Sequence, residues 1–105
     1  MNSKELFDYQ SDFFGKCISL TKSKNHDYTS ASDDALSNFK VVQQYGITPE
    51  QGLLTRMSDK MMRIGTFINK GTLKVDDEKI QDTLQDLANY ASLLSAHIHS
   101  KNNQQ

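Results

Sequence analysis

Residues 76–99, DDEKIQDTLQDLANYASLLSAHIH, decide the fold. Apolar residues recur along this stretch at alternating intervals of four and three: Ile80, Leu84, Leu87, Ala91, Leu94 and Ile98. Because such spacing follows one face of an α-helix, it predicts a helix over about residues 77–99, with Asp76 as its N-cap. A seam of this kind is typical of helices that pack against an antiparallel neighbour.

The preceding helix has the clearest start in the chain. Thr48 is placed to cap it, Pro49 fits the first helical position, and Gln51 completes a capping box. Gly71 suits the left-handed position that ends such a helix. A seam of apolar residues follows the start at intervals of three and four: Leu54, Met57, Met61, Ile64 and Ile68. We therefore expect a second long helix whose seam lies in the core.

Two further helices are expected before residue 46. The first covers about residues 4–22, where a stripe of apolar residues recurs at helical spacing: Leu6, Phe13, Cys17 and Leu20. Residues 22–32 lack apolar periodicity and are expected to form a loop. A short helix over about residues 33–45 should end at Gly46. The predicted fold class is all-α, a four-helix bundle-like domain over residues 1–100 with three long helices, one short helix and a frayed tail at 101–105.

Composition narrows the possible partners. The 12 basic and 13 acidic residues give a net charge of −1, which argues against direct binding of duplex nucleic acid through a basic surface. No apolar run approaches the roughly 20 residues that cross a bilayer, and Cys17 has no second cysteine to pair with. With a charged start in place of a signal peptide, the chain is expected to be cytoplasmic, without membrane association. An apolar fraction of only 36% indicates that a second subunit completes the core, as in a homo-oligomer.

Polar residues gather on one side of each of the last two expected helices. Arg56, Asp59, Lys60 and Arg63 lie at helical spacing in one, and Asp82, Asp86 and Asn89 in the other. Carboxylates one turn apart, such as Asp82 and Asp86, can hold Mg²⁺, which prefers oxygen ligands. Arginine and lysine side chains can then neutralise a phosphate. These faces therefore form a candidate phosphate site, with Mg²⁺ as the cofactor if the protein hydrolyses its ligand.

The simpler alternative is that both faces are solvated and hold only i,i+4 ion pairs. One detail argues against it, because Leu93 lies on the face of Asp82 and Asn89, with Tyr90 and His97 beside it. A face exposed to solvent would not ordinarily carry leucine and tyrosine there. We expect it to meet another helix, a ligand or a second subunit.

A second cluster lies at residues 26–28. His26 and Asp27 could exchange protons, Tyr28 could stack on a base, and Lys24 precedes them. In the structural alternative, Asp27 forms a turn and Tyr28 anchors the loop on the core. The residue types leave both open.

Several short motifs together resemble the nucleotide modification associated domain 1 family of small phage and bacterial proteins. They are Lys24-x-x-Asp27-Tyr28, Asn38-Phe39, Arg56-x-x-Asp59-Lys60-x-x-Arg63 and, the most specific, residues 82–90, DTLQDLANY. The resemblance covers roughly residues 15–97. This family is similar to the MazG-like all-α nucleoside triphosphate pyrophosphohydrolases, helical oligomers that hold Mg²⁺ on acidic helices. The resemblance implies a nucleotide ligand in a bacterium or an infected host cell.

The resemblance also implies roles for individual residues. Ligand-binding roles pass to Lys24, Asp27, Tyr28, Asn38, Arg56, Asp59, Lys60, Arg63, Asn89 and Tyr90, and metal binding to Asp82 and Asp86. The chain departs from the pyrophosphohydrolases, which pair an E-x-x-E segment with a later E-x-x-D segment. Three hypotheses follow: a nucleotide-binding protein, with Mg²⁺-dependent hydrolysis left open; a non-catalytic phage anti-defence protein that sequesters a nucleotide signal; and a helical protein-interaction module.

Overall fold

The computed structural model describes residues 1–28, 34–71 and 79–103, except for the side chains of residues 26–28. In chain order these ranges form α1 (Ser3–Tyr28), α2 (Ser37–Lys40), the 3₁₀ helix η1 (Val41–Tyr45), α3 (Pro49–Lys70) and α4 (Ile80–Asn103). No strand occurs within them, and none of their helices is long and apolar enough to cross a membrane. The prediction of an all-α, bundle-like domain with three long helices is confirmed.

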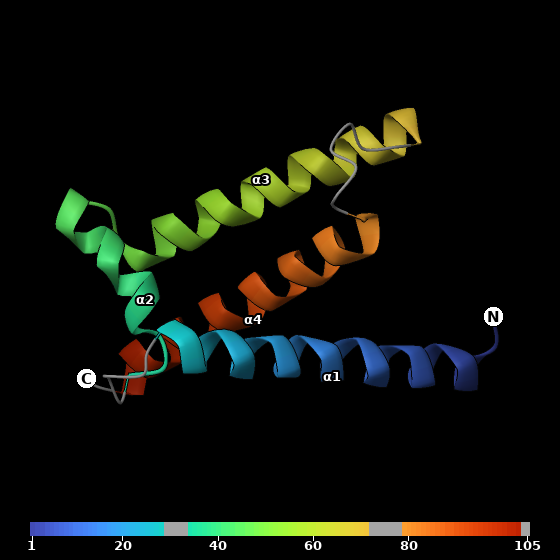
Figure 1. Ribbon diagram of the computed structural model, residues 1–105, viewed down its shortest axis with the longest axis horizontal. Helices are drawn as coiled ribbons and strands as arrows, with labels where there is room; N and C mark the ends of the chain where they lie inside the picture. Colours follow the sequence, from blue (N-terminus) through green and yellow to red (C-terminus); the bar gives the residue numbers. More distant parts are fainter. Residues whose placement is uncertain (29–33, 72–78, 104–105) are drawn as a thin grey trace.

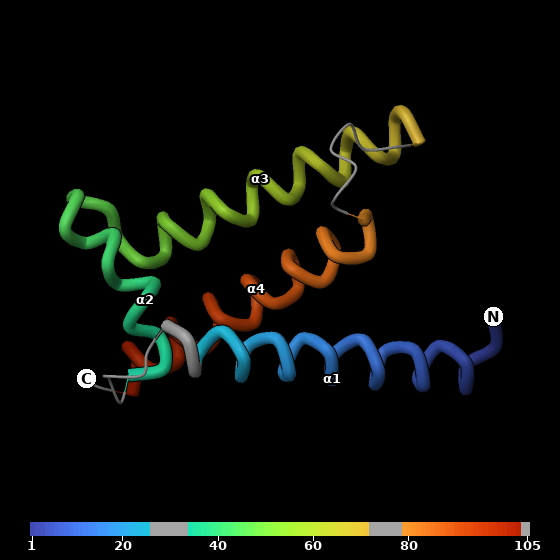
Figure 2. The backbone as a smooth tube through the Cα atoms, in the orientation of Figure 1, coloured from blue at the N-terminus to red at the C-terminus, as the bar shows by residue number. Residues whose placement is uncertain are grey.

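The three long helices form an open arrangement around α4. Helix α4 packs against α3, which runs in the opposite direction, and against α1. Helices α1 and α3 diverge from each other, as Figures 1 and 2 show. The short α2 and η1 lead from α1 to the start of α3, at one end of the molecule.

The predicted start and end of α3 and the predicted end at Gly46 are confirmed, because local chemistry alone determines them. The Thr48 Oγ1 atom accepts a hydrogen bond from the Gln51 amide at 3.1 Å, and Gln51 Oε1 accepts one from the Thr48 amide at 2.9 Å. Gly46 and Gly71 end η1 and α3 with φ of 76° and 75°. Only glycine adopts this left-handed conformation without a steric penalty.

The expected boundaries of the other helices were less accurate. Helix α1 continues through the expected loop to Tyr28, and the 33–45 segment divides into α2 and η1. Close to the expected end of α1, Thr21 Oγ1 donates a hydrogen bond to Asn89 Oδ1 of α4 at 2.9 Å. Helix α4 extends to Asn103, beyond the expected end of the helix. Its expected start at residues 76–77 lies outside the described residues.

A polar cluster fastens the start of α3 to the last turns of α4. The Oε1 atom of Glu50 lies 2.7 Å from His97 Nε2 and 2.9 Å from Lys101 Nζ. His97 is buried, with 6% of its surface exposed. The hydrogen bond from Lys101, the Glu50 backbone amide and His97 together lower the pKa of Glu50 to about 2. Glu50 is therefore held as a carboxylate between two helices.

The inward face of α3 differs from the prediction. Leu54, Met61 and Ile68 of the expected core seam are 58%, 55% and 74% exposed. The inward residues are the buried Leu53 and the half-buried residues that follow it at intervals of four and three: Met57, Lys60, Ile64 and Phe67. Met57 and Ile64 of the expected seam do lie inward, so α3 is rotated by less than one residue relative to that seam. This rotation lets the Lys60 ammonium reach the Asp86 carboxylate of α4 at 3.3 Å.

Helix α4 is rotated in a similar way, although Ile80, Leu84, Leu87 and Leu94 of its expected seam remain half-buried. Its buried residues are Thr83, Asn89 and His97, whereas Ile98 of the expected seam is 45% exposed. The face that carries Asp86 and Asn89 was expected to lie opposite the apolar seam and to meet another helix, a ligand or a second subunit, and it meets α1 and α3. Buried hydrogen bonds and ion pairs of these polar residues to α1 and α3 explain the difference.

Candidate functional site

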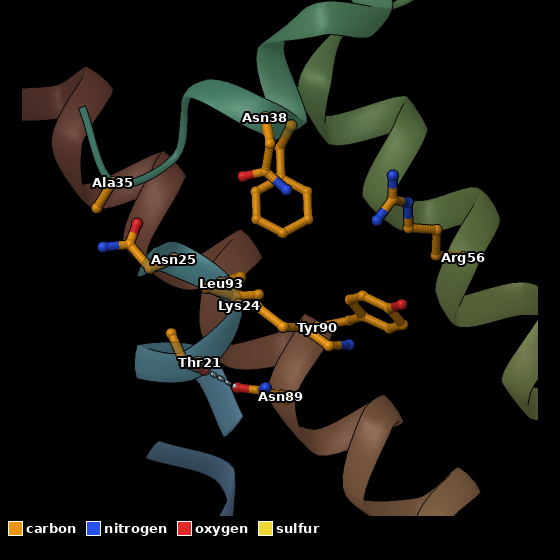
Figure 3. A pocket seen from close by; sticks show the side chains of 10 residues that line it. Thr21, Lys24, Asn25, Ala35, Asn38, Arg56, Asn89, Tyr90 and Leu93 are labelled. Atoms are coloured by element: carbon orange, nitrogen blue, oxygen red, sulfur yellow. Dashed lines mark hydrogen bonds between the residues drawn. The ribbon is translucent and has the colours of Figure 1, made fainter. Parts of the chain in front are cut away.

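A pocket of about 250 Å³ lies where α1, α2, α3 and α4 approach one another. Helix α2 covers it on one side, and Arg56 of α3 and Tyr90 of α4 extend toward it (Figure 3). Its described lining residues are Thr21, Lys24, Asn25, Ala35, Asn38, Phe39, Arg56, Asn89, Tyr90 and Leu93. Four helices therefore contribute to one concave site.

The charges of the described lining are of one sign. Lys24 and Arg56 are cationic, and no described lining residue is a carboxylate. The Arg56 guanidinium carbon lies 5.3 Å from the ring centre of Phe39 and 5.9 Å from that of Tyr90. These cation–π contacts orient the guanidinium without neutralising its charge. Within the described part of the chain, neither cation forms an ion pair.

The inner wall of the pocket is held by a buried hydrogen bond. Thr21 and Asn89 form it between α1 and α4, and Asn89 is only 9% exposed (Figure 3). The Asn89 oxygen accepts this bond, and its amide nitrogen has no partner among the described residues. Because Asn89 lines the pocket, that nitrogen is a donor available to a ligand.

The sequence-predicted residues separate into three groups. Five lie together in the pocket: Lys24, Asn38, Arg56, Asn89 and Tyr90. Asp27 and Tyr28 end α1, next to the pocket residue Asn25, but their side chains and that of His26 lie outside the described part. The other predicted residues, Asp59, Lys60, Arg63, Asp82 and Asp86, are not among the described lining.

Four residues of that third group form ion pairs outside the described pocket lining. Arg63 Nε lies 3.3 Å from Asp59 Oδ2 on α3, and Lys60 pairs with Asp86. Asp82 is exposed and lines a different pocket between α1 and α4. Arg56 and Arg63, seven residues apart on α3, are therefore in different environments.

The described residues do not fit a Mg²⁺ site at Asp82 and Asp86. A metal site of this kind needs several oxygen ligands free to bind the ion. The Asp86 carboxylate instead faces the ammonium of Lys60, and both side chains are largely covered. Among the described residues, no three carboxylate, histidine or cysteine side chains gather as metal ligands would.

Cys17 offers no nucleophile to the site. It is 5% exposed, and burial, together with the charge of Asp86, raises the pKa of its thiol. Its Sγ atom lies 3.7 Å from the Gln85 carbonyl oxygen. Cys17 therefore packs as a protonated, structural thiol, as its apolar stripe predicted.

Sequence reasoning missed half of the described lining. Asn25 was missed because the first helix was expected to end at residue 22, and Thr21 and Phe39 were not selected as site residues. A signal for Phe39 was available, since it directly follows Asn38 in one of the family motifs. Leu93 and Tyr90 had been recognised as unusual on a polar face, and both line the pocket.

Comparison with known proteins places the chain in a family. No curated protein and no solved structure matches it significantly. The profile of the nucleotide modification associated domain 1 family matches residues 24–98. This range begins at the pocket residue Lys24 and contains every described lining residue except Thr21. The chain belongs to the nucleotide modification associated domain 1 family.

Proposed function

We propose that the protein binds a phosphorylated nucleotide or a nucleotide-derived signal in the pocket formed by α1, α2, α3 and α4. One observation carries the proposal: the described lining combines two cations and two aromatic rings with no carboxylate. Such a lining favours an anion that also carries a polar ring system. The name of the family to which the chain belongs refers to nucleotide modification, which supports the same ligand class.

Each part of a nucleotide has a suitable partner in the lining. Arg56 and Lys24 would bind phosphate oxygens, and the rings that hold Arg56 reduce the entropy lost when it does so. The amides of Asn38 and Asn89 would bond the polar edge of a base or sugar. Because these side chains come from different helices, the proposed ligand would also hold the helices together.

Binding without hydrolysis is the form of this proposal that the geometry favours. Asp86, one of the two carboxylates expected to hold Mg²⁺, is paired with Lys60. The other, Asp82, is not among the described lining of the pocket. A protein that binds a nucleotide signal and leaves it intact sequesters it. Sequestration is how a phage protein would act against a nucleotide-based host defence.

Self-association is the second partnership that we propose. Several large apolar side chains on α1 and α3 are more than half exposed in the single chain. A homo-oligomer would cover them. Nucleotide binding and self-association are separate proposals, because the described pocket is lined by one chain.

The test of nucleotide binding begins with mass spectrometry of small molecules released from the purified, heat-denatured protein. Calorimetric titration with mono-, di- and triphosphates then follows, each in Mg²⁺ and in EDTA, with chromatography for products. We expect one class of nucleotide to bind in both buffers and to be recovered intact. If the protein neither releases nor binds any nucleotide, the proposal is wrong and the remaining hypothesis is a protein-interaction module. Product formed only with Mg²⁺ would show that the protein is a hydrolase.

A further inference from the structure

Helix α1 carries an apolar stripe that faces away from the rest of the chain. Phe7, Phe14 and Ile18 are 62%, 52% and 57% exposed and follow one another at intervals of seven and four. We call these residues the outer stripe of α1. The other side of the helix contacts α4, where Cys17 is buried. The outer stripe is therefore a second face for helix packing, rotated by about one residue from the first.

Helix α3 repeats this arrangement. Its outer stripe, Leu54, Met61 and Ile68, keeps a seven-residue spacing, and small residues, Ser58 and Gly65, stand four positions after Leu54 and Met61. Together the large and small residues follow one another at intervals of four and three along one helix face. The small residues between the large ones let another helix approach closely. No charged residue occupies these positions.

The chain has more surface than a folded monomer of its mass. Its accessible surface is 7773 Å², against roughly 5,900 Å² expected for 11.9 kDa. Its radius of gyration of 15.8 Å exceeds the roughly 13 Å expected for its length. The excess is about 1,800 Å² per chain, so two chains could bury about 3,600 Å², within the 2,000–5,000 Å² typical of obligate homodimers.

We infer that the outer stripes of α1 and α3 are the interface with a second copy of this chain, and that the chain folds only as that dimer. The inference rests on the proposed self-association and not on nucleotide binding. A second copy of the chain suits both stripes, because it carries the same apolar stripes and can therefore offer each of them an apolar surface to pack against. The net charge of −1 leaves little repulsion between two copies.

The test uses two double variants that differ by one position in each helix. Ile18→Glu with Leu54→Glu introduces two carboxylates into the outer stripes. The matched control, Ser19→Glu with Thr55→Glu, introduces the same charge at exposed neighbouring positions outside them. Light scattering measures mass, and circular dichroism follows thermal unfolding over a hundredfold range of protein concentration.

For the wild type and the control we expect a mass of twice 11.9 kDa and a Tm that rises with concentration. The stripe variant should lose the dimer and most of its helical signal at low micromolar concentration. A stripe variant that keeps the dimer mass would place the interface elsewhere and overturn this inference while leaving self-association intact. A wild type of single-chain mass would overturn both. A folded, single-chain stripe variant would overturn the claim that folding needs the dimer.

Discussion

The Lys60 ammonium of α3 lies 3.3 Å from the Asp86 carboxylate of α4, with 15% and 25% of the two side chains exposed. Each charge is desolvated by the helix packing, and each is the other's counterion. Removing one partner from such a pair costs stability, because the attraction between two partly desolvated charges is lost. The pair therefore helps to determine which faces of α3 and α4 meet.

Asp86→Asn should lower the free energy of unfolding by about 1–2 kcal/mol, less than for a fully buried pair because water still reaches both groups. Urea titration measures the change. Asp82→Asn, at an exposed position on the same helix, is the control and should stay within about 0.5 kcal/mol of wild type. EDTA should alter neither stability nor ligand binding. Unchanged stability together with loss of Mg²⁺-dependent turnover would instead identify Asp86 as a metal ligand.

Arg56→Ala should weaken nucleotide binding by about 1.5–3 kcal/mol, because it removes a charge-assisted hydrogen bond to the phosphate. Arg63→Ala is the matched control, since Arg63 pairs with Asp59 and is not among the described lining. Its affinity should match that of the wild type. Calorimetric titration compares the two. Equal losses from both variants would show that the described pocket is not the nucleotide site.

Thr21→Val should cost about 1–3 kcal/mol of stability, because it leaves the buried Asn89 oxygen without its donor. Thr66→Val is the control: among the described residues, the Thr66 hydroxyl donates to the Met62 carbonyl of its own helix, at an exposed site. We expect a change within about 0.5 kcal/mol there. Thermal unfolding distinguishes the variants, and equal shifts in Tm would contradict a structural role for the Thr21–Asn89 bond.

Glu50 should make stability depend on pH in the acid range. Its folded pKa of about 2 lies below the ordinary 4.5, so its stabilising contribution is complete above 4.5 and is lost as the pH falls toward 2. Urea unfolding between pH 6 and pH 2.5 measures this. Other carboxyl groups titrate in both proteins, so the comparison is with Glu50→Gln. The stability difference between wild type and variant should shrink as the pH falls, and a constant difference would refute this linkage.

The ends of α3 were predictable from sequence because they depend on neighbours within a few residues. Thr48, Pro49 and Gln51 satisfy the first free amides of the helix, and Gly71 alone tolerates the left-handed turn after it. Much of the pocket was also predictable, because Lys24, Asn38, Arg56, Asn89 and Tyr90 lie in family motifs. That these motifs meet in one site depends on α1 extending past residue 22, because Lys24 lies in that extension.

By itself, the sequence determined that the chain is helical, where α3 begins and ends, and that its long helices have apolar stripes. Only the tertiary structure decided which face of each helix turns inward. Two faces of α3, one through Leu53 and one through Leu54, share Met57 and Ile64, and both satisfy helical periodicity. Periodicity cannot distinguish them. The choice depends on polar contacts between helices, Lys60 with Asp86 and Glu50 with His97, whose partners are distant in sequence and are brought together only when the helices pack.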